Sequence, residues 1–167
     1  AIPAAEAAGE DRALAHACYV LDWALVESGR AGEAGFSDRA LAIYRRLGDV
    51  GREAAVLNNA GGFAYRDGRW KDAMTLYVQG AEASARSGNS ANAAFGDCNV
   101  GELLSDQGHW DEAEMLLRRA RQVWRATGYE WGVAYATAQL GRLAARTGHE
   151  GQALTRLLDA LARFRAL

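Results

Sequence analysis

The sequence predicts an all-α fold, an α-α superhelix of four helical hairpins with about eight antiparallel helices. Three observations support this prediction. Helix-forming residues dominate, and the only proline, Pro3, stands at the start of the chain, so no later residue is a strong helix breaker. Apolar residues recur at helical spacing. Glycines recur at a constant interval of 40 residues, which indicates a repeat protein.

The glycine register divides the chain into four repeats. Three glycine columns keep the same interval: Gly48, Gly88 and Gly128; Gly61, Gly101 and Gly141; Gly68, Gly108 and Gly148. We therefore expect a single domain over residues 1–167 with repeats at approximately 10–49, 50–89, 90–129 and 130–167. Because the chain opens with Ala1 in place of methionine, we also expect it to be a fragment of a larger multidomain protein.

Each column predicts a structural role within a hairpin. Glycines equivalent to Gly68 are expected to end the first helix of a hairpin, where glycine takes a left-handed cap conformation without a Cβ penalty. Glycines equivalent to Gly61 fall inside that helix, where glycine costs about 1 kcal/mol relative to alanine. We expect a second helix to approach closely there, with Ala73 and its equivalents as the opposing contacts. In the first repeat Asp22 takes this position, so looser helix contacts are expected.

The second helices of the hairpins are predicted to be amphipathic. One of them carries an apolar stripe at spacings of three and four, which predicts core packing rather than a cofactor site: Ala113, Leu116, Leu117, Ala120, Val123 and Trp124. In the last helix the corresponding side ends in Leu157, Leu161, Phe164 and Leu167. These residues predict an exposed apolar end, covered either by a following repeat or by a homodimer contact.

The motifs around the glycines resemble the tetratricopeptide repeat. The first helices contain the triplets Asn59-Ala60-Gly61, Asn99-Val100-Gly101 and Gln139-Leu140-Gly141. The turns read Asp67-Gly68-Arg69-Trp70, Gln107-Gly108-His109-Trp110 and Thr147-Gly148-His149-Glu150. Glu150 takes the aromatic position of the last turn and departs from the pattern. The resemblance implies a solenoid whose first helices line a concave, partner-binding face.

A narrower resemblance concerns the parent protein. Several segments are similar to the C-terminal repeat region of actinobacterial class III adenylate/guanylate cyclases that carry an ATPase module: Asn58-Asn59-Ala60-Gly61, Asp111-Glu112-Ala113-Glu114, Val123-Trp124-Arg125-Ala126 and Gln139-Leu140-Gly141-Arg142. This resemblance implies a cytoplasmic bacterial signalling protein whose nucleotide chemistry belongs to upstream domains.

The sequence offers little for catalysis. It has no Gly-rich phosphate loop ending in Lys-Ser/Thr and no His-Glu-x-x-His pair, so we expect no catalytic residues, no cofactor and no metal. The net charge of −2, without a basic run, argues against nucleic-acid binding. No apolar stretch approaches the length of a membrane span, so we expect no membrane contact and a cytoplasmic location.

A protein-interaction or regulatory scaffold is the favoured function, with a peptide, a partner protein or other domains of the same chain as its partner. The predicted concave-face residues are Tyr19, Trp23, Asn58, Asn59, Tyr65, Phe95, Asn99, Glu102, Tyr135, Gln139, Arg142 and Arg146. The amides Asn59, Asn99 and Gln139 could bond an extended peptide or could satisfy neighbouring helices. A small-molecule sensor using the concave channel and a self-association module are the alternatives.

Overall fold

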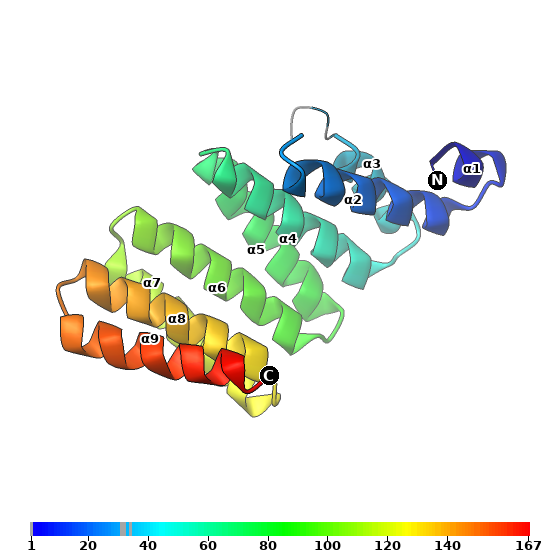
Figure 1. Ribbon diagram of the computed structural model, residues 1–167. Helices are drawn as coiled ribbons and strands as arrows, with labels where there is room; N and C mark the ends of the chain where they lie inside the picture. The colour runs from blue at the N-terminus through cyan, green and yellow to red at the C-terminus, as the bar shows by residue number, and fades with distance from the viewer. Residues whose placement is uncertain (1, 31–32, 34) are drawn as a thin grey trace. The chain divides into compact units, whose positions relative to one another are not determined.

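The computed structural model describes residues 2–30, 33 and 35–167. These residues form nine α-helices and no strand (Figure 1). The helices are α1 (Ile2–Ala7), α2 (Asp11–Glu27), α3 (Ser37–Arg46), α4 (Val50–Arg66), α5 (Trp70–Arg86), α6 (Ser90–Asp106), α7 (Trp110–Ala126), α8 (Glu130–Arg146) and α9 (Glu150–Arg165). The short helix α1 precedes the predicted hairpins and was not expected. It packs against α2 through Ile2 and Ala5, whose neighbours in the core include Leu14.

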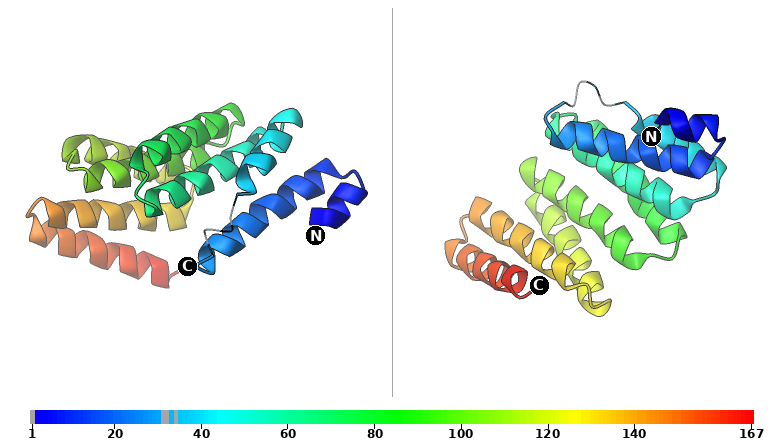
Figure 2. Two further views of the ribbon diagram at one scale, coloured as in Figure 1. Left: turned by 90° about the horizontal axis from the view of Figure 1, so that it is seen from above. Right: turned by 45° about the vertical axis from the view of Figure 1, so that its right-hand side comes forward.

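The chain divides into two compact units, Ala1–Ser87 and Gly88–Leu167. The first unit contains α1 to α5, and the second unit contains α6 to α9. Within the second unit, α6 pairs with α7 and α8 pairs with α9, and the views in Figure 2 agree that α8 and α9 lie side by side. Within the first unit, α2 pairs with α3 and α4 pairs with α5.

The turn glycines end the helices as predicted. Gly68 has a φ of 74°, and the N–H groups of Gly68 and Arg69 donate to the carbonyl oxygens of Tyr65 and Ala64 at 3.1 and 2.9 Å. This pair of bonds is the Schellman arrangement, which satisfies carbonyls at a helix C-terminus. The chain therefore reverses within a few residues, and the following helix starts at Trp70.

The glycines inside the first helices do mark close approach, and large side chains of the second helix are their nearest contacts. A Cβ on Gly61 would lie 2.6 Å from Cδ1 of Tyr77, and a Cβ on Gly101 would lie 3.0 Å from Cγ of Leu117. Of the predicted alanines, Ala113 also contributes, because its carbonyl oxygen would lie 3.3 Å from the Cβ on Gly101. The alanines equivalent to Ala73 are themselves buried.

The helices of the first hairpin pack less extensively than those of the later hairpins, as expected, and α3 has only 10 residues. Asp22 itself is nevertheless well accommodated. Its side chain is only 2% exposed, and its carboxylate accepts N–H bonds from Gly35, Phe36 and Ser37 at 2.8, 2.9 and 2.5 Å. The carboxylate thus satisfies backbone donors at the start of α3. Burial by itself raises the pKa of Asp22, but the hydrogen bonds outweigh it and lower that pKa below its usual value.

The core of the second unit is built around Trp124, which is fully buried. Its ring contacts Phe95 with 4.9 Å between centroids, and its indole Nε1 donates to the carbonyl of Ala91 at 2.8 Å. Leu117, Leu140 and other buried residues of α6, α7 and α8 surround it. In the first unit, Tyr44 and Leu57 are the largest buried side chains of two smaller clusters. The predicted apolar stripe of α7 is therefore core.

Candidate functional site

The predicted concave-face residues form one group in each unit. In the first unit, Tyr19 and Trp23 lie on α2, while Asn58, Asn59 and Tyr65 lie on α4. The structure brings Asn59 and Tyr19 together, because the Asn59 amide donates to the Tyr19 hydroxyl at 2.8 Å. Burial raises the pKa of Tyr19, so this hydroxyl stays protonated near neutral pH. Trp23 lies one turn further along α2 and is half exposed.

The second group is denser and lies on the first helices of the second unit. Phe95, Asn99 and Glu102 come from α6. The α8 residues are Tyr135, Gln139, Arg142 and Arg146. They occupy one face of α8, because spacings of four, three and four residues return to the same side of a helix.

Polar contacts link α6 to α8 between positions one repeat apart. Arg142 donates to the Glu102 carboxylate at 2.5 Å, and the Tyr135 hydroxyl donates to the same carboxylate at 3.3 Å. Arg146 donates to the Ser105 hydroxyl at 2.8 Å and also pairs with Asp106. The guanidinium groups of Arg142 and Arg146 keep part of their surface exposed while their carboxylate partners are largely covered. The exposed part of this face is therefore cationic.

The amides of the predicted row are engaged with their neighbours. Gln139 is 7% exposed, and its side-chain oxygen accepts from Arg142 at 2.9 Å. Asn59 donates to Tyr19 as described, and the remaining member of the row, Asn99, also has a partner. The sequence left open whether these amides bond a peptide or satisfy neighbouring helices. In the structure, each amide has a partner within the protein.

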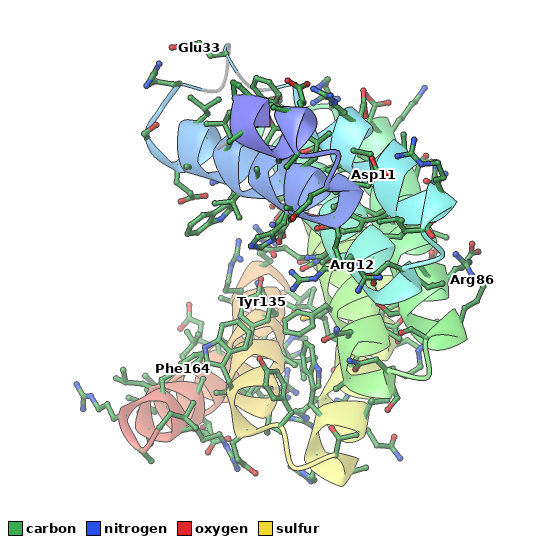
Figure 3. The ribbon with its side chains drawn as sticks, turned by 90° about the vertical axis from the view of Figure 1, so that its right-hand side faces the viewer. Asp11, Arg12, Glu33, Arg86, Tyr135 and Phe164 are labelled. Carbon is green, nitrogen blue, oxygen red and sulfur yellow. The ribbon has the colours of Figure 1, made fainter. Side chains whose placement is uncertain are left out.

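An aromatic cluster adjoins the α8 face. Trp131, on the first turn of α8, is 41% exposed and stacks on Tyr135 with 5.1 Å between ring centroids. It also contacts Phe95 and Phe164 at 6.0 Å each, and Tyr129 at 6.3 Å. Figure 3 shows Tyr135 on α8 and Phe164 on α9, the two rings that flank Trp131. The exposed ring of Trp131 thus sits on a rigid aromatic base.

Trp131 was missed in the sequence, although a signal was present. It lies four residues before Tyr135, so helical spacing alone places it on the same face. The equivalent positions in earlier repeats hold Gly51 and Ala91, so no aromatic residue recurs there to mark the position.

The local environment keeps the reactive side chains of this region neutral. Burial and the nearby Glu102 raise the pKa of the Tyr135 hydroxyl. Burial also raises the pKa of Cys98, so the thiol stays protonated and unreactive. The region therefore provides aromatic surface, amides and guanidinium groups, which are groups for binding.

Other features of the described residues do not add a site to this face. A pocket of about 330 Å³ lies among α7, α8 and α9, and one of about 310 Å³ lies in the first unit; neither is lined by the predicted concave-face residues. Within residues 2–30, 33 and 35–167 there is no cluster of three metal-ligating side chains. None of the described helices has the length and apolar character needed to cross a bilayer.

Comparisons with known proteins agree with this architecture. Residues 89–166 match the tetratricopeptide repeat family. The crystal structure of BtubC (BKLC) from P. vanneervenii superposes on 94% of this chain with a TM-score of 0.78 and 20% identity, and the match covers 65% of that structure. No curated protein matches the sequence. The chain therefore has the predicted all-α, tetratricopeptide-like repeat fold, and its residues 89–166 match the tetratricopeptide repeat family.

Proposed function

We propose that the second unit is a protein-interaction module that binds its partner through the α8 face, defined as Trp131, Tyr135, Gln139, Arg142 and Arg146. The exposed Trp131 ring carries this proposal. A tryptophan that is partly exposed yet held by four neighbouring rings loses little conformational entropy on binding. Tryptophan, tyrosine and arginine are also the residues that most often dominate binding energy at protein interfaces.

The charged end of the α8 face would fix the orientation of a bound peptide along α8. Arg142 and Arg146 follow Trp131 by 11 and 15 residues, so they lie roughly 16 and 22 Å further along α8 at 1.5 Å per residue. Their carboxylate partners Glu102 and Asp106 hold the guanidinium groups in place. A peptide with an apolar side chain on Trp131 and an acidic group near Arg142 fits this arrangement, because arginine binds carboxylates with paired N–H donors.

The wider context of the module is also part of the proposal. Tetratricopeptide repeats are generally non-catalytic scaffolds, and residues 89–166 match that family. We place the module in a bacterial signalling protein, at the C-terminal side of an adenylate/guanylate cyclase with an ATPase module, on the strength of the motif resemblance described above. The flanking gene sequence tests this placement directly, since cyclase and ATPase motifs should precede Ala1.

A selection with phage-displayed random peptides tests the binding face. Peptides enriched on the wild-type chain should lose about 30-fold in affinity with Trp131→Ala, since truncating a central tryptophan typically costs about 2 kcal/mol or more. Trp110→Ala is the matched control, because Trp110 is similarly exposed, also lies in the first turn of a helix of the second unit and stands outside the α8 face. Calorimetry that shows equal losses for the two variants would refute the proposed face.

A further inference from the structure

The last helix carries a long, partly exposed apolar stripe, of which Leu157 and Phe164 also lie against Gly141 and Trp131 of α8. Leu154, Leu158 and Leu161 follow spacings of four and three, as do Leu157, Leu161 and Phe164, and each of these residues is at least 37% exposed. Among the described helices, α9 packs along α8, and its Arg156 also reaches Glu114 of α7. Alternating spacings of three and four are the pattern by which one helix packs along another.

The stripe differs from the corresponding side of α7. Leu154, Leu158 and Leu161 stand one repeat after Glu114, Arg118 and Arg121. In α7 these positions take polar contacts: Arg118 donates to Glu114 at 2.7 Å, and Arg156 of the next hairpin lies 3.9 Å from the same carboxylate. The equivalent positions of α5 hold Met74, Val78 and Ala81, so α9 carries three large leucines at positions that are polar in α7 and apolar in α5.

The ends of the stripe carry opposite charges. Glu150 lies in the first turn of α9, and Arg165 is its last residue. At about 100° per residue, Glu150, Leu154, Leu161 and Arg165 fall within an arc of about 60°. Both charges therefore border the apolar stripe, one at each end.

We propose that α9 forms a symmetric homodimer by packing antiparallel against α9 of a second copy of this chain. With the two-fold axis between Leu157 and Leu158, Leu154 of one copy meets Leu161 of the other. The same symmetry sets Glu150 of each copy beside Arg165 of the other copy, which gives two equivalent ion pairs. A parallel pair would instead bring like charges together at both ends. This contact lies outside the α8 face and goes beyond the proposed partner binding.

Sedimentation velocity over a range of concentrations tests the dimer with the full chain. The wild type should form dimers, and Leu158→Glu should weaken association about 100-fold or more, because each interface would bury two uncompensated carboxylates. Met115→Glu is the control: Met115 is an exposed apolar residue of α7 away from the stripe, and its substitution should leave association unchanged. Circular dichroism must show that both variants stay helical. A wild type that stays monomeric at every concentration overturns the proposal.

A charge exchange tests the antiparallel direction. Glu150→Arg and Arg165→Glu should each weaken the dimer, because each single change creates like-charged pairs at both ends. An equimolar mixture of the two variants should recover association, since every pair in the mixed dimer is again opposite in charge. If the single variants associate as well as or better than the wild type, the antiparallel arrangement is wrong.

Discussion

At the scale of single residues, Asp22 shows how a polar residue can replace a small one. The repeat register puts a packing glycine at this position in later hairpins, and aspartate would be costly there if it were left without partners. The backbone of residues 35–37 supplies three N–H donors, so the buried carboxylate becomes a cap for α3. The side chain thus holds the start of α3 against α2.

Replacing this carboxylate should reduce stability in a pH-dependent way. We expect Asp22→Asn to cost about 1–3 kcal/mol of unfolding free energy at pH 7, because the amide cannot accept at both positions. The folded-state pKa of Asp22 is lowered, so its contribution is fully present above the unfolded pKa of about 3.9 and is lost as pH falls through the lower folded value. The difference in unfolding free energy between the wild type and Asp22→Asn should therefore become smaller below about pH 4.

Urea denaturation at several pH values measures this difference. Asp38→Asn is the control, because Asp38 is an exposed residue in the first turn of α3, the helix that Asp22 caps. A loss for Asp22→Asn that is no larger than for Asp38→Asn, or that does not change on acidification, would contradict the capping role.

At the scale of the helix, Gly51 and Gly61 show the difference between a glycine that packing requires and one that only lowers helix propensity. Gly51 and Gly61 both lie in α4 with ordinary helical backbone. A Cβ at Gly51 would meet nothing within 4 Å, whereas a Cβ at Gly61 would overlap the ring of Tyr77. Of these two positions, glycine is required only at Gly61, where the second helix sends a large side chain against the first.

Substitution by alanine should therefore have opposite effects at these two positions. We expect Gly61→Ala to destabilise the chain by about 1–3 kcal/mol through overpacking against Tyr77. Gly51→Ala should stabilise it by up to about 1 kcal/mol, because alanine loses less backbone entropy in a helix. Thermal unfolding followed by circular dichroism gives both values, and a stabilising Gly61→Ala would show that the Tyr77 ring moves aside at little cost.

At the scale of the whole molecule, the chain consists of two compact units with separate cores. The second unit contains the Trp124 core, the α8 face and the α9 stripe. Every contact used to argue for those two surfaces lies within residues 88–167. The unit therefore has the buried core that independent folding requires.

We expect residues 88–167 expressed alone to fold and unfold cooperatively. The change in Trp124 environment should accompany the loss of helical signal, and Trp124→Ala should cost about 3–5 kcal/mol, as is usual for a large buried aromatic. Matching transitions by fluorescence and circular dichroism would support the expectation. A fragment that shows little helix, or that melts without a cooperative transition, would show that the unit depends on residues before Gly88.

The sequence predicted much more of the fold than of the site. Gly61 and Gly68 could be assigned roles because backbone geometry fixes what glycine does in a helix or at its end. Trp131 could not be found by the register, since it differs from its equivalents in other repeats. The register did single out Asp22, but its capping role depends on the backbone of residues 35–37, which the register does not describe. The amide row was recognisable, but whether Gln139 faces a ligand or Arg142 depends on a side chain from the same helix and its Glu102 partner.

The helical hairpins could be predicted because the period of glycines and the 3.6-residue spacing of apolar residues are local properties of the chain. Which surfaces stay open could be read only from the packing of the helices. Burial depends on neighbours: Leu117 is fully covered while Leu157, its equivalent one repeat later, is 40% exposed, although both lie on the same side of similar helices. The difference comes from the helix that packs beside one and not beside the other.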